Sequence, residues 1–111
     1  MATAIIIADD FTGAGDSGVH FARAGKRTAL LLDHAGLESE LSRYEMLSLS
    51  SESRFLGPGR AAAAVRALVA RCAGLGAEII FKKVDSTLRG NLGAEIEAIL
   101  KATGRRAALV C

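Results

Sequence analysis

The chain has 111 residues, of which 50% are hydrophobic, 12 are glycine and 1 is proline. This length suits one small domain, and the composition is typical of an alanine- and glycine-rich α/β protein, which excludes a disordered or fibrous one. A net charge of +2 argues against a nucleic-acid partner, and no apolar run approaches the roughly 18 residues of a membrane span, so we expect a cytoplasmic protein without a membrane partner.

Strand and helix signals alternate in the first half of the chain. Uninterrupted apolar runs suit parallel strands that are covered on both faces, and apolar residues at helical spacing suit the helices between them. In chain order, the pattern predicts a strand at 4–8, a polar glycine-containing loop at 9–15, a helix at about 14–24, a strand at 27–32, an ambiguous stretch with one helical turn at 34–44 and a short strand at 46–50.

The second half continues this alternation. Apolar residues at helical spacing predict an amphipathic helix at 60–73, on which Cys72 is a buried packing thiol. Residues 78–84 predict a fourth strand and 107–110 the beginning of a fifth, and between them we expect a helix capped by Asn91. The predicted fold is a three-layer α/β sandwich with a mostly parallel sheet of about five strands.

One motif points to a dinucleotide. The stretch from Gly13 to Gly18 satisfies G-x-G-x-x-G, and Asp33 follows twenty residues after Gly13, as a ribose-binding acid would. However, four residues separate the first strand from Gly13, whereas the fingerprint needs its glycine turn at the strand end. Asp9 and Asp10 would also repel a pyrophosphate by about 4 kcal/mol at 4 Å, which outweighs the roughly 0.3 to 1 kcal/mol of a helix N-terminus. A dinucleotide-binding domain is therefore the least favoured alternative.

Three polar loops, at 9–16, 50–54 and 82–91, fall at the carboxyl ends of strands, where ligands gather in parallel sheets. The carboxylates of Asp9 and Asp10 can accept hydrogen bonds from sugar hydroxyls, and one could take a proton from a reacting hydroxyl. Neighbouring residues on a strand point in opposite directions, so we expect one to face a ligand and the other to brace a loop. The alternatives are a Mg²⁺ site, or acids that are solvated or cap a helix.

The other two loops carry cations. Lys83, Asp85 and Arg89 surround a turn, and Arg89 with the backbone amides before the next helix predicts an anion cradle. Ser53 and Arg54, in the loop at 50–54, add a further basic side chain, that of Arg54, to this edge. The alternative is an ion-pair network that only braces the loops. Acidic side chains that can bind hydroxyls and basic side chains that can bind an anion together favour a small polyhydroxy acid as ligand. The sequence contains no G-x-x-x-x-G-K-[ST] phosphate loop.

Three blocks carry a family resemblance: IIIADDFTGAGDSGVHFARAG, SSESR and FKKVDSTLRGNLGAEI. They resemble, in order, the N-terminal sugar-binding domain of the four-carbon acid sugar kinase family. The resemblance implies an ATP-dependent kinase that phosphorylates a terminal hydroxyl of threonate, erythronate or an oxo-tetronate. Some members of this family carry a label as Hrp-dependent type III effector proteins, so a non-catalytic effector or binding domain of the same fold is the alternative.

The resemblance also implies roles for individual residues. Asp10 would contact substrate hydroxyls and is the first candidate for the catalytic base, with Asp85 the second. No metal-binding residue is expected in this chain. The expected substrate-binding residues are Asp9, Asp10, Ser53, Arg54, Lys83, Asp85, Ser86, Arg89 and Asn91.

Family members continue beyond the length of this chain into a separate ATP-binding domain. Residues 1–111 are therefore expected to be an acid-sugar-binding domain that is truncated at its C-terminal end and inactive alone. ATP and Mg²⁺ would bind mainly outside this chain. Its expected partners are a small sugar acid, the missing nucleotide-binding domain and, in a homo-oligomer, a second copy.

Overall fold

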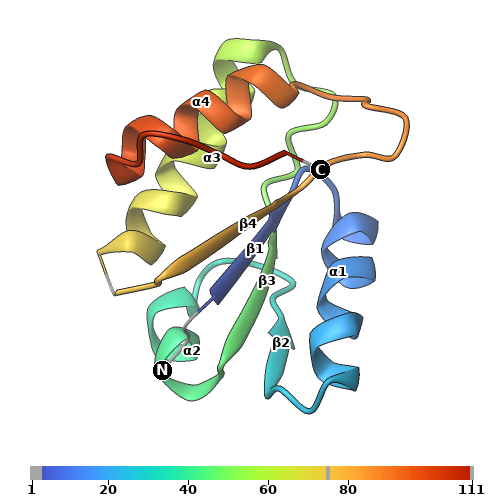
Figure 1. The fold of residues 1–111 in the computed structure, drawn as a ribbon, viewed down its shortest axis with the longest axis vertical. Helices are drawn as coiled ribbons and strands as arrows, with labels where there is room; N and C mark the ends of the chain where they lie inside the picture. The colour runs from blue at the N-terminus through green and yellow to red at the C-terminus, as the bar shows by residue number, and fades with distance from the viewer. Residues whose placement is uncertain (1–3, 75, 111) are drawn as a thin grey trace.

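Four parallel strands alternate with four helices in residues 4–74 and 76–110, the part that the computed structural model describes (Figure 1). The strands pair in the order β2-β3-β1-β4. This arrangement confirms the predicted α/β sandwich, with four strands in place of about five. The elements are β1 (Ala4–Ala8), α1 (Phe11–Arg23), β2 (Thr28–Leu30), α2 (Leu37–Arg43), β3 (Met46–Ser50), α3 (Pro58–Ala73), β4 (Ile79–Lys83) and α4 (Leu92–Thr103).

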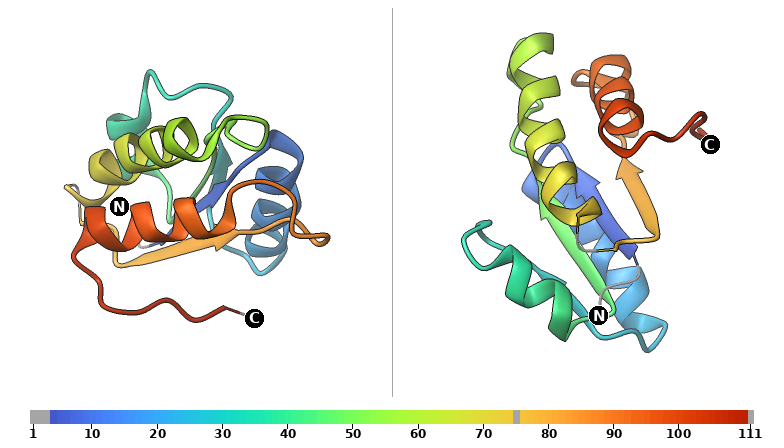
Figure 2. Two further views of the ribbon diagram at one scale, coloured as in Figure 1. Left: turned by 90° about the horizontal axis from the view of Figure 1, so that it is seen from above. Right: turned by 90° about the vertical axis from the view of Figure 1, so that its left-hand side faces the viewer.

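Alternate residues of each strand serve two separate layers, because successive side chains on a strand point to opposite faces. Ile5 and Ile7 of β1 belong to a large core with apolar side chains of α2, α3 and α4. Ile6 packs instead with Met46 and with Phe21 of α1. Figure 2 shows the same division, with α1 on one side of the sheet and α3 and α4 on the other. Cover on both faces explains why β1 is an uninterrupted apolar run.

The chain leaves neighbouring strands β1 and β3 toward opposite faces of the sheet. From β1 it enters α1, and from β3 it enters α3 on the other face. Loops that diverge in this way leave a crevice at the carboxyl ends of the strands, where ligands bind in open α/β sheets. The polar loops after Ala8 and Ser50 begin at this crevice.

Helix α1 begins earlier than the sequence pattern suggests. Residues 9–15 were expected to form a loop, but the helix begins at Phe11 because the Asp10 carboxylate accepts a hydrogen bond of 2.8 Å from the Gly13 amide. The G-x-G-x-x-G stretch therefore lies inside a helix. The glycine turn that a dinucleotide needs at the end of the strand is not present at this position.

The glycines of α1 let the helix approach the sheet. A Cβ on Gly18 would lie 3.3 Å from Ser48 Cβ of β3, and the Ser48 hydroxyl donates a hydrogen bond of 2.6 Å to the Ala14 carbonyl. Gly15 has more room, since its Cβ would meet only Leu30 Cδ2 at 3.8 Å. This part of the glycine motif thus serves helix–sheet packing.

Helix α3 buries the apolar face that its spacing predicts. Val65, Leu68, Val69 and Cys72 are all buried, which confirms the packing role of Cys72. Burial raises the pKa of the Cys72 thiol to about 11. None of the helices in the described part of the chain is long and apolar enough to cross a membrane.

The fifth strand expected at 107–110 is not formed. Residues 105–110 are exposed and irregular, and Leu109 is 94% exposed. The reason lies in the neighbouring strand, because Ile79 and Phe81 of β4 are themselves exposed on the face that α1 covers elsewhere. A strand added beside β4 would extend the sheet over a face on which these apolar side chains are already half-exposed. Elsewhere, the ambiguous stretch at 34–44 forms the short helix α2, and β2 and β4 are shorter at their ends than predicted.

Two glycine substitutions in α1 test this packing. Gly15→Ala should raise the free energy of unfolding by about 0.5 to 1 kcal/mol, because alanine is the better helix former and has room. Gly18→Val should lower it by about 1 to 3 kcal/mol, because the side chain would press on β3. Urea denaturation of both variants measures the difference. A Gly18→Val protein as stable as wild type would contradict the close approach of α1 to Ser48.

Candidate functional site

The guanidinium of Arg54 lies at the carboxyl ends of the strands, between three carboxylates. Its Nη2 is 2.9 Å from Asp9 Oδ1 and 3.4 Å from Asp85 Oδ1, and its Nη1 is 3.0 Å from Asp10 Oδ2. Only 10% of the Arg54 side chain is exposed. The hydrogen bond to Asp9 is the main cause that raises the pKa of Arg54. Arg54 therefore joins loops that follow three different strands.

The two aspartates after β1 have different surroundings. Asp9 is buried, and its backbone carbonyl accepts hydrogen bonds from the amides of Ser53 and Arg54 at 3.0 and 3.2 Å. Asp9 thus braces the loop after β3. The Asp10 side chain caps α1 and is 27% exposed. Asp10 is consequently the member of the pair that a ligand can reach.

Asp85 accepts hydrogen bonds from its own turn. Arg89 donates through Nε and Nη2, each at 2.9 Å, the Thr87 hydroxyl donates at 2.5 Å, and the backbone amides of Thr87 and Arg89 donate at 3.1 and 3.2 Å. Arg89, followed by Thr87, holds the pKa of Asp85 well below its usual range. The amides expected to form an anion cradle thus bind a carboxylate of the chain itself, as the ion-pair alternative supposed.

Ser53 and Asn91 face inward. The Ser53 hydroxyl is fully buried and donates to Glu95 Oε2 at 3.1 Å. Asn91 occupies the N-cap position of α4, but its side chain makes no cap bond. It donates instead to the carbonyls of Leu56 and Ser53, at 2.9 and 3.4 Å. The expected cap bond is absent because the Asn91 amide group is oriented by the two hydrogen bonds that it donates to the loop after β3.

The two lysines at the end of β4 point to opposite faces of the sheet. Lys83 lies on the α1 side, with its Cγ beside Gly13. Lys82 points toward α4, where its Nζ is 3.3 Å from Glu95 Oε1. Glu95 was not among the expected site residues. A signal was available, since Glu95 lies three residues after Leu92 and four before Ile99 on the apolar stripe of α4.

All the predicted site residues lie at one rim of the sheet, in two tiers. Asp9, Ser53 and Asp85 are buried, and the largely covered Arg54 side chain pairs with both aspartates. Arg89, whose side chain is 61% exposed, Ser86 and Asp10 reach the surface. Asp10 and Arg89 are linked through Arg54 and Asp85, so acids from the first loop and cations from the third do converge.

This rim does not fit a metal ion. The described residues contain no group of three or more His, Cys, Asp or Glu side chains placed to hold one. Asp9, Asp10 and Asp85 each contact an arginine, whose charge would repel a divalent cation. The alternative that Asp9 and Asp10 hold Mg²⁺ is therefore not supported.

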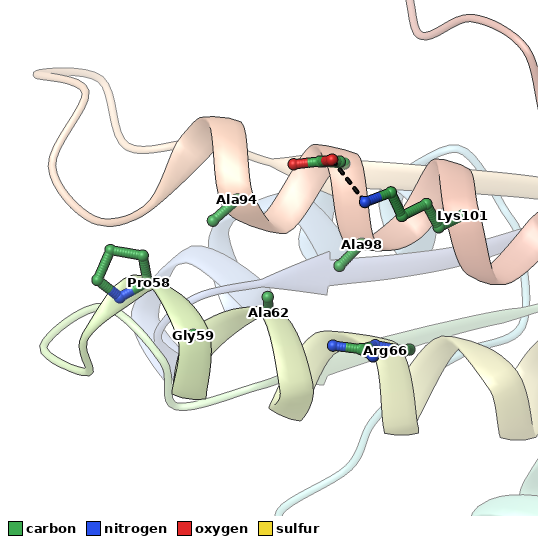
Figure 3. A pocket seen from close by; sticks show the side chains of 8 residues that line it. Pro58, Gly59, Ala62, Arg66, Ala94, Ala98 and Lys101 are labelled. Atoms are coloured by element: carbon green, nitrogen blue, oxygen red, sulfur yellow. Dashed lines mark ion pairs between the residues drawn. The ribbon is translucent and has the colours of Figure 1, made fainter.

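A hollow of about 300 Å³ lies away from this rim, between α3 and α4 (Figure 3). Ala62, Ala94 and Ala98 form its floor, and the ion pair of Glu97 with Lys101, 2.7 Å long, lies beside it. None of its lining residues belongs to the Arg54 cluster.

A family model described as a sugar-binding N-terminal domain matches residues 4–111. The chain belongs to this family. The resemblance to the N-terminal domain of four-carbon acid sugar kinases is thereby confirmed.

Relatives within this family are named as kinases. A D-threonate kinase of Salmonella typhimurium is 41% identical over 107 residues, which cover 96% of this chain and 25% of the kinase. A D-erythronate kinase of Heliobacterium modesticaldum is 43% identical over 110 residues, which cover 94% of this chain and 24% of the kinase. The sugar-binding domain described here spans about a quarter of the length of these relatives.

A solved structure shares the fold. It is a domain of unknown function from Bordetella bronchiseptica, crystallised with bound citrate as a domain-swapped dimer. The match has a TM-score of 0.85 and 41% sequence identity, and it covers 90% of this chain and 26% of the other.

Gly90→Ala tests how closely the site is packed. Gly90 has φ +92°, and a Cβ there would clash with the Asp9 carboxylate. We expect a loss of about 3 kcal/mol or more in the free energy of unfolding, from backbone strain and displacement of Asp9. Gly104→Ala is the matched control, since Gly104 has φ +67° with open space around it, and should cost about 1 to 2 kcal/mol. Urea denaturation that gives equal losses would contradict the packing of Gly90 on Asp9.

The low pKa of Asp85 predicts an acid-sensitive stability. Because its folded-state pKa lies below the unfolded value of about 3.9, its ionised form stabilises the fold fully above that pH. This contribution is lost as the pH falls from about 4 toward the folded-state pKa. Urea denaturation at several pH values should show wild type losing stability below about pH 4 more steeply than Asp85→Asn does. Parallel curves would contradict the ionic role of Asp85.

Proposed function

We propose that this chain is the substrate-binding part of an ATP-dependent kinase that phosphorylates a terminal hydroxyl of a four-carbon sugar acid, such as threonate or erythronate. The observation that carries the proposal is the convergence of Asp10, Arg54, Asp85 and Arg89 at the crevice of the sheet. This mixture of charges predicts the chemical class of the ligand, because carboxylates accept hydrogen bonds from hydroxyls and cations bind a carboxylate. The names of the kinase relatives support the same ligand class.

Arg89 and Lys83 would anchor the carboxylate of the sugar acid. A guanidinium has five N–H donors, and Arg89 uses two of them on Asp85, so three remain for a ligand. Asp85 thereby holds the guanidinium in one orientation at low entropic cost. Ser86, exposed in the same turn, would contact a hydroxyl.

Asp10 is the better candidate for the catalytic base. A base must reach the proton that it abstracts, and the Asp10 side chain is 27% exposed, whereas that of Asp85 is 8% exposed. Asp85 also accepts hydrogen bonds from several donors, and these bonds favour its ionised form and lower its basicity. In this proposal Asp85 is a positioning residue.

ATP and Mg²⁺ would bind mainly outside this chain. The sequence has no phosphate loop, and the rim does not fit a metal ion. Phosphoryl transfer depends on positioned ATP and metal, so the chain alone should bind the sugar acid without transferring phosphate. We place this activity in the cytoplasm, and we infer a homo-oligomer because the Bordetella bronchiseptica relative forms a domain-swapped dimer.

Calorimetric titration tests the proposal directly. Wild type should release or absorb a stoichiometric heat with D-threonate or D-erythronate. Arg89→Ala should weaken that binding by about 1.5 to 3 kcal/mol, the scale of a charge-assisted hydrogen bond. Arg66→Ala, which removes an exposed arginine from α3, is the matched control and should bind as wild type does.

Two outcomes would overturn parts of this proposal. If the folded wild-type chain shows no heat of binding with any four-carbon sugar acid, a non-catalytic domain of the same fold is favoured. Unchanged affinity in Arg89→Ala, with heat in wild type, would remove Arg89 from the site and keep the ligand class.

A further inference from the structure

Glu95 is a charged residue in the core, between the site and α4. Its side chain is 1% exposed, and its Oε2 accepts a hydrogen bond of 3.1 Å from the Ser53 hydroxyl. Its Oε1 lies 3.3 Å from Lys82 Nζ but has no aligned hydrogen bond from any described residue. The contact with Lys82 is thus an ion pair without a directed hydrogen bond.

Packing alone does not require a carboxylate at this position. Ala98 and Ile99 of the same helix are buried in the hydrophobic core, so an apolar residue would suit this face of α4. A buried carboxylate loses its hydration, and pairing with a buried cation often only offsets that cost. The ion pair of Glu95 with Lys82 is better explained by the positions in which Glu95 holds its two partners.

The two partners of Glu95 are Ser53, in the loop after β3, and Lys82, near the end of β4. Ser53 directly precedes Arg54 in the loop after β3. Lys82 Nζ also donates a hydrogen bond of 2.8 Å to the Lys83 carbonyl, at the end of β4 and two residues before Asp85. The Arg54 and Asp85 side chains form an ion pair, with Nη2 of Arg54 3.4 Å from Oδ1 of Asp85. The buried carboxylate of Glu95 therefore contacts both Ser53, which precedes Arg54, and Lys82, which bonds to the chain just before Asp85.

We propose that Glu95 is a positioning residue that sets the distance between the Arg54 loop and the Asp85 turn, and so the orientation of the groups that bind the sugar acid. The part of this inference that concerns a ligand rests on the proposed function. Removing the charge of Glu95 would free Ser53 and Lys82 to move apart. Arg54 would then lose its contact with Asp85, and Arg89 would lose its fixed partner.

The test uses two variants and a control on the same helix. Glu95→Gln keeps the shape of the side chain and removes its charge, and Ser53→Ala removes the hydrogen bond while leaving the ion pair. Glu97→Gln, which breaks the exposed ion pair with Lys101, is the control. Each is titrated with D-threonate and D-erythronate, and each is examined by NMR through the Nε–Hε resonance of Arg54.

Both variants should weaken sugar-acid binding about tenfold, which is about 1.4 kcal/mol, and should shift the Arg54 resonance, whereas the control should do neither. A merely structural role would lower the free energy of unfolding and leave that resonance unchanged. Folded Glu95→Gln protein with wild-type affinity and an unmoved resonance would overturn the inference.

The remaining outcomes are also decisive. If Glu95→Gln does not fold, Ser53→Ala decides by the same two measurements. If wild type binds no sugar acid, the proposed function fails, and the Arg54 resonance alone then supports or overturns the positioning role.

Discussion

The buried guanidinium of Arg54 is the interaction on which the rim depends. A cation with a side chain only 10% exposed is unstable without anions around it, and Asp9, Asp10 and Asp85 supply them from the loops after β1 and β4. Removing one partner of a buried pair typically costs about 3 to 5 kcal/mol, because the other charge remains buried. Electrostatic contacts thus hold the loops after three strands in one geometry.

This constraint explains why the site has two tiers. Of the three carboxylates that neutralise Arg54, Asp9 and Asp85 turn inward and are almost fully covered, whereas the Asp10 side chain stays 27% exposed. Asp10 and Arg89 keep exposed surface while each contacts a buried member of the cluster. The inner tier orients the outer tier, and such support is what precise binding requires.

Much of the fold could be predicted from the sequence, and the failures have identifiable causes. The bounds of β1 were predicted because a strand covered on both faces reads as an apolar run, and those of β3 because its apolar residues alternate with serines. The start of α1 was missed because its glycines have poor helix propensity, and the Asp10 cap with the Ser48 contact overrides it. The strand at 107–110 failed because propensity cannot show whether a neighbouring face is covered.

The meeting of the predicted residues at one edge of the sheet could be predicted from the sequence, but their pairings could not. The loops after parallel strands meet at one edge, so the convergence of Asp10 and Arg89 follows from topology. Which acid would pair with which base depends on side-chain distances of a few ångströms, and Asp85 occupies the backbone amides that the pattern assigned to a ligand. Glu95 was missed because a glutamate is usually exposed to solvent. Its helical spacing nevertheless places it among the apolar residues of α4.

The balance of charge at the rim also bears on the ligand class. A phosphate dianion at Arg89 would lie near Asp10 and Asp85, and a charge pair about 4 Å apart costs about 4 kcal/mol at an effective dielectric near 20. A hydroxy acid brings one negative group for Arg89 and neutral hydroxyl donors for Asp10, so it satisfies both kinds of group together. In the proposed function, the same carboxylates would make the rim a poor main binding site for a nucleotide and a suitable one for a sugar acid, so most of the nucleotide would be held by other residues.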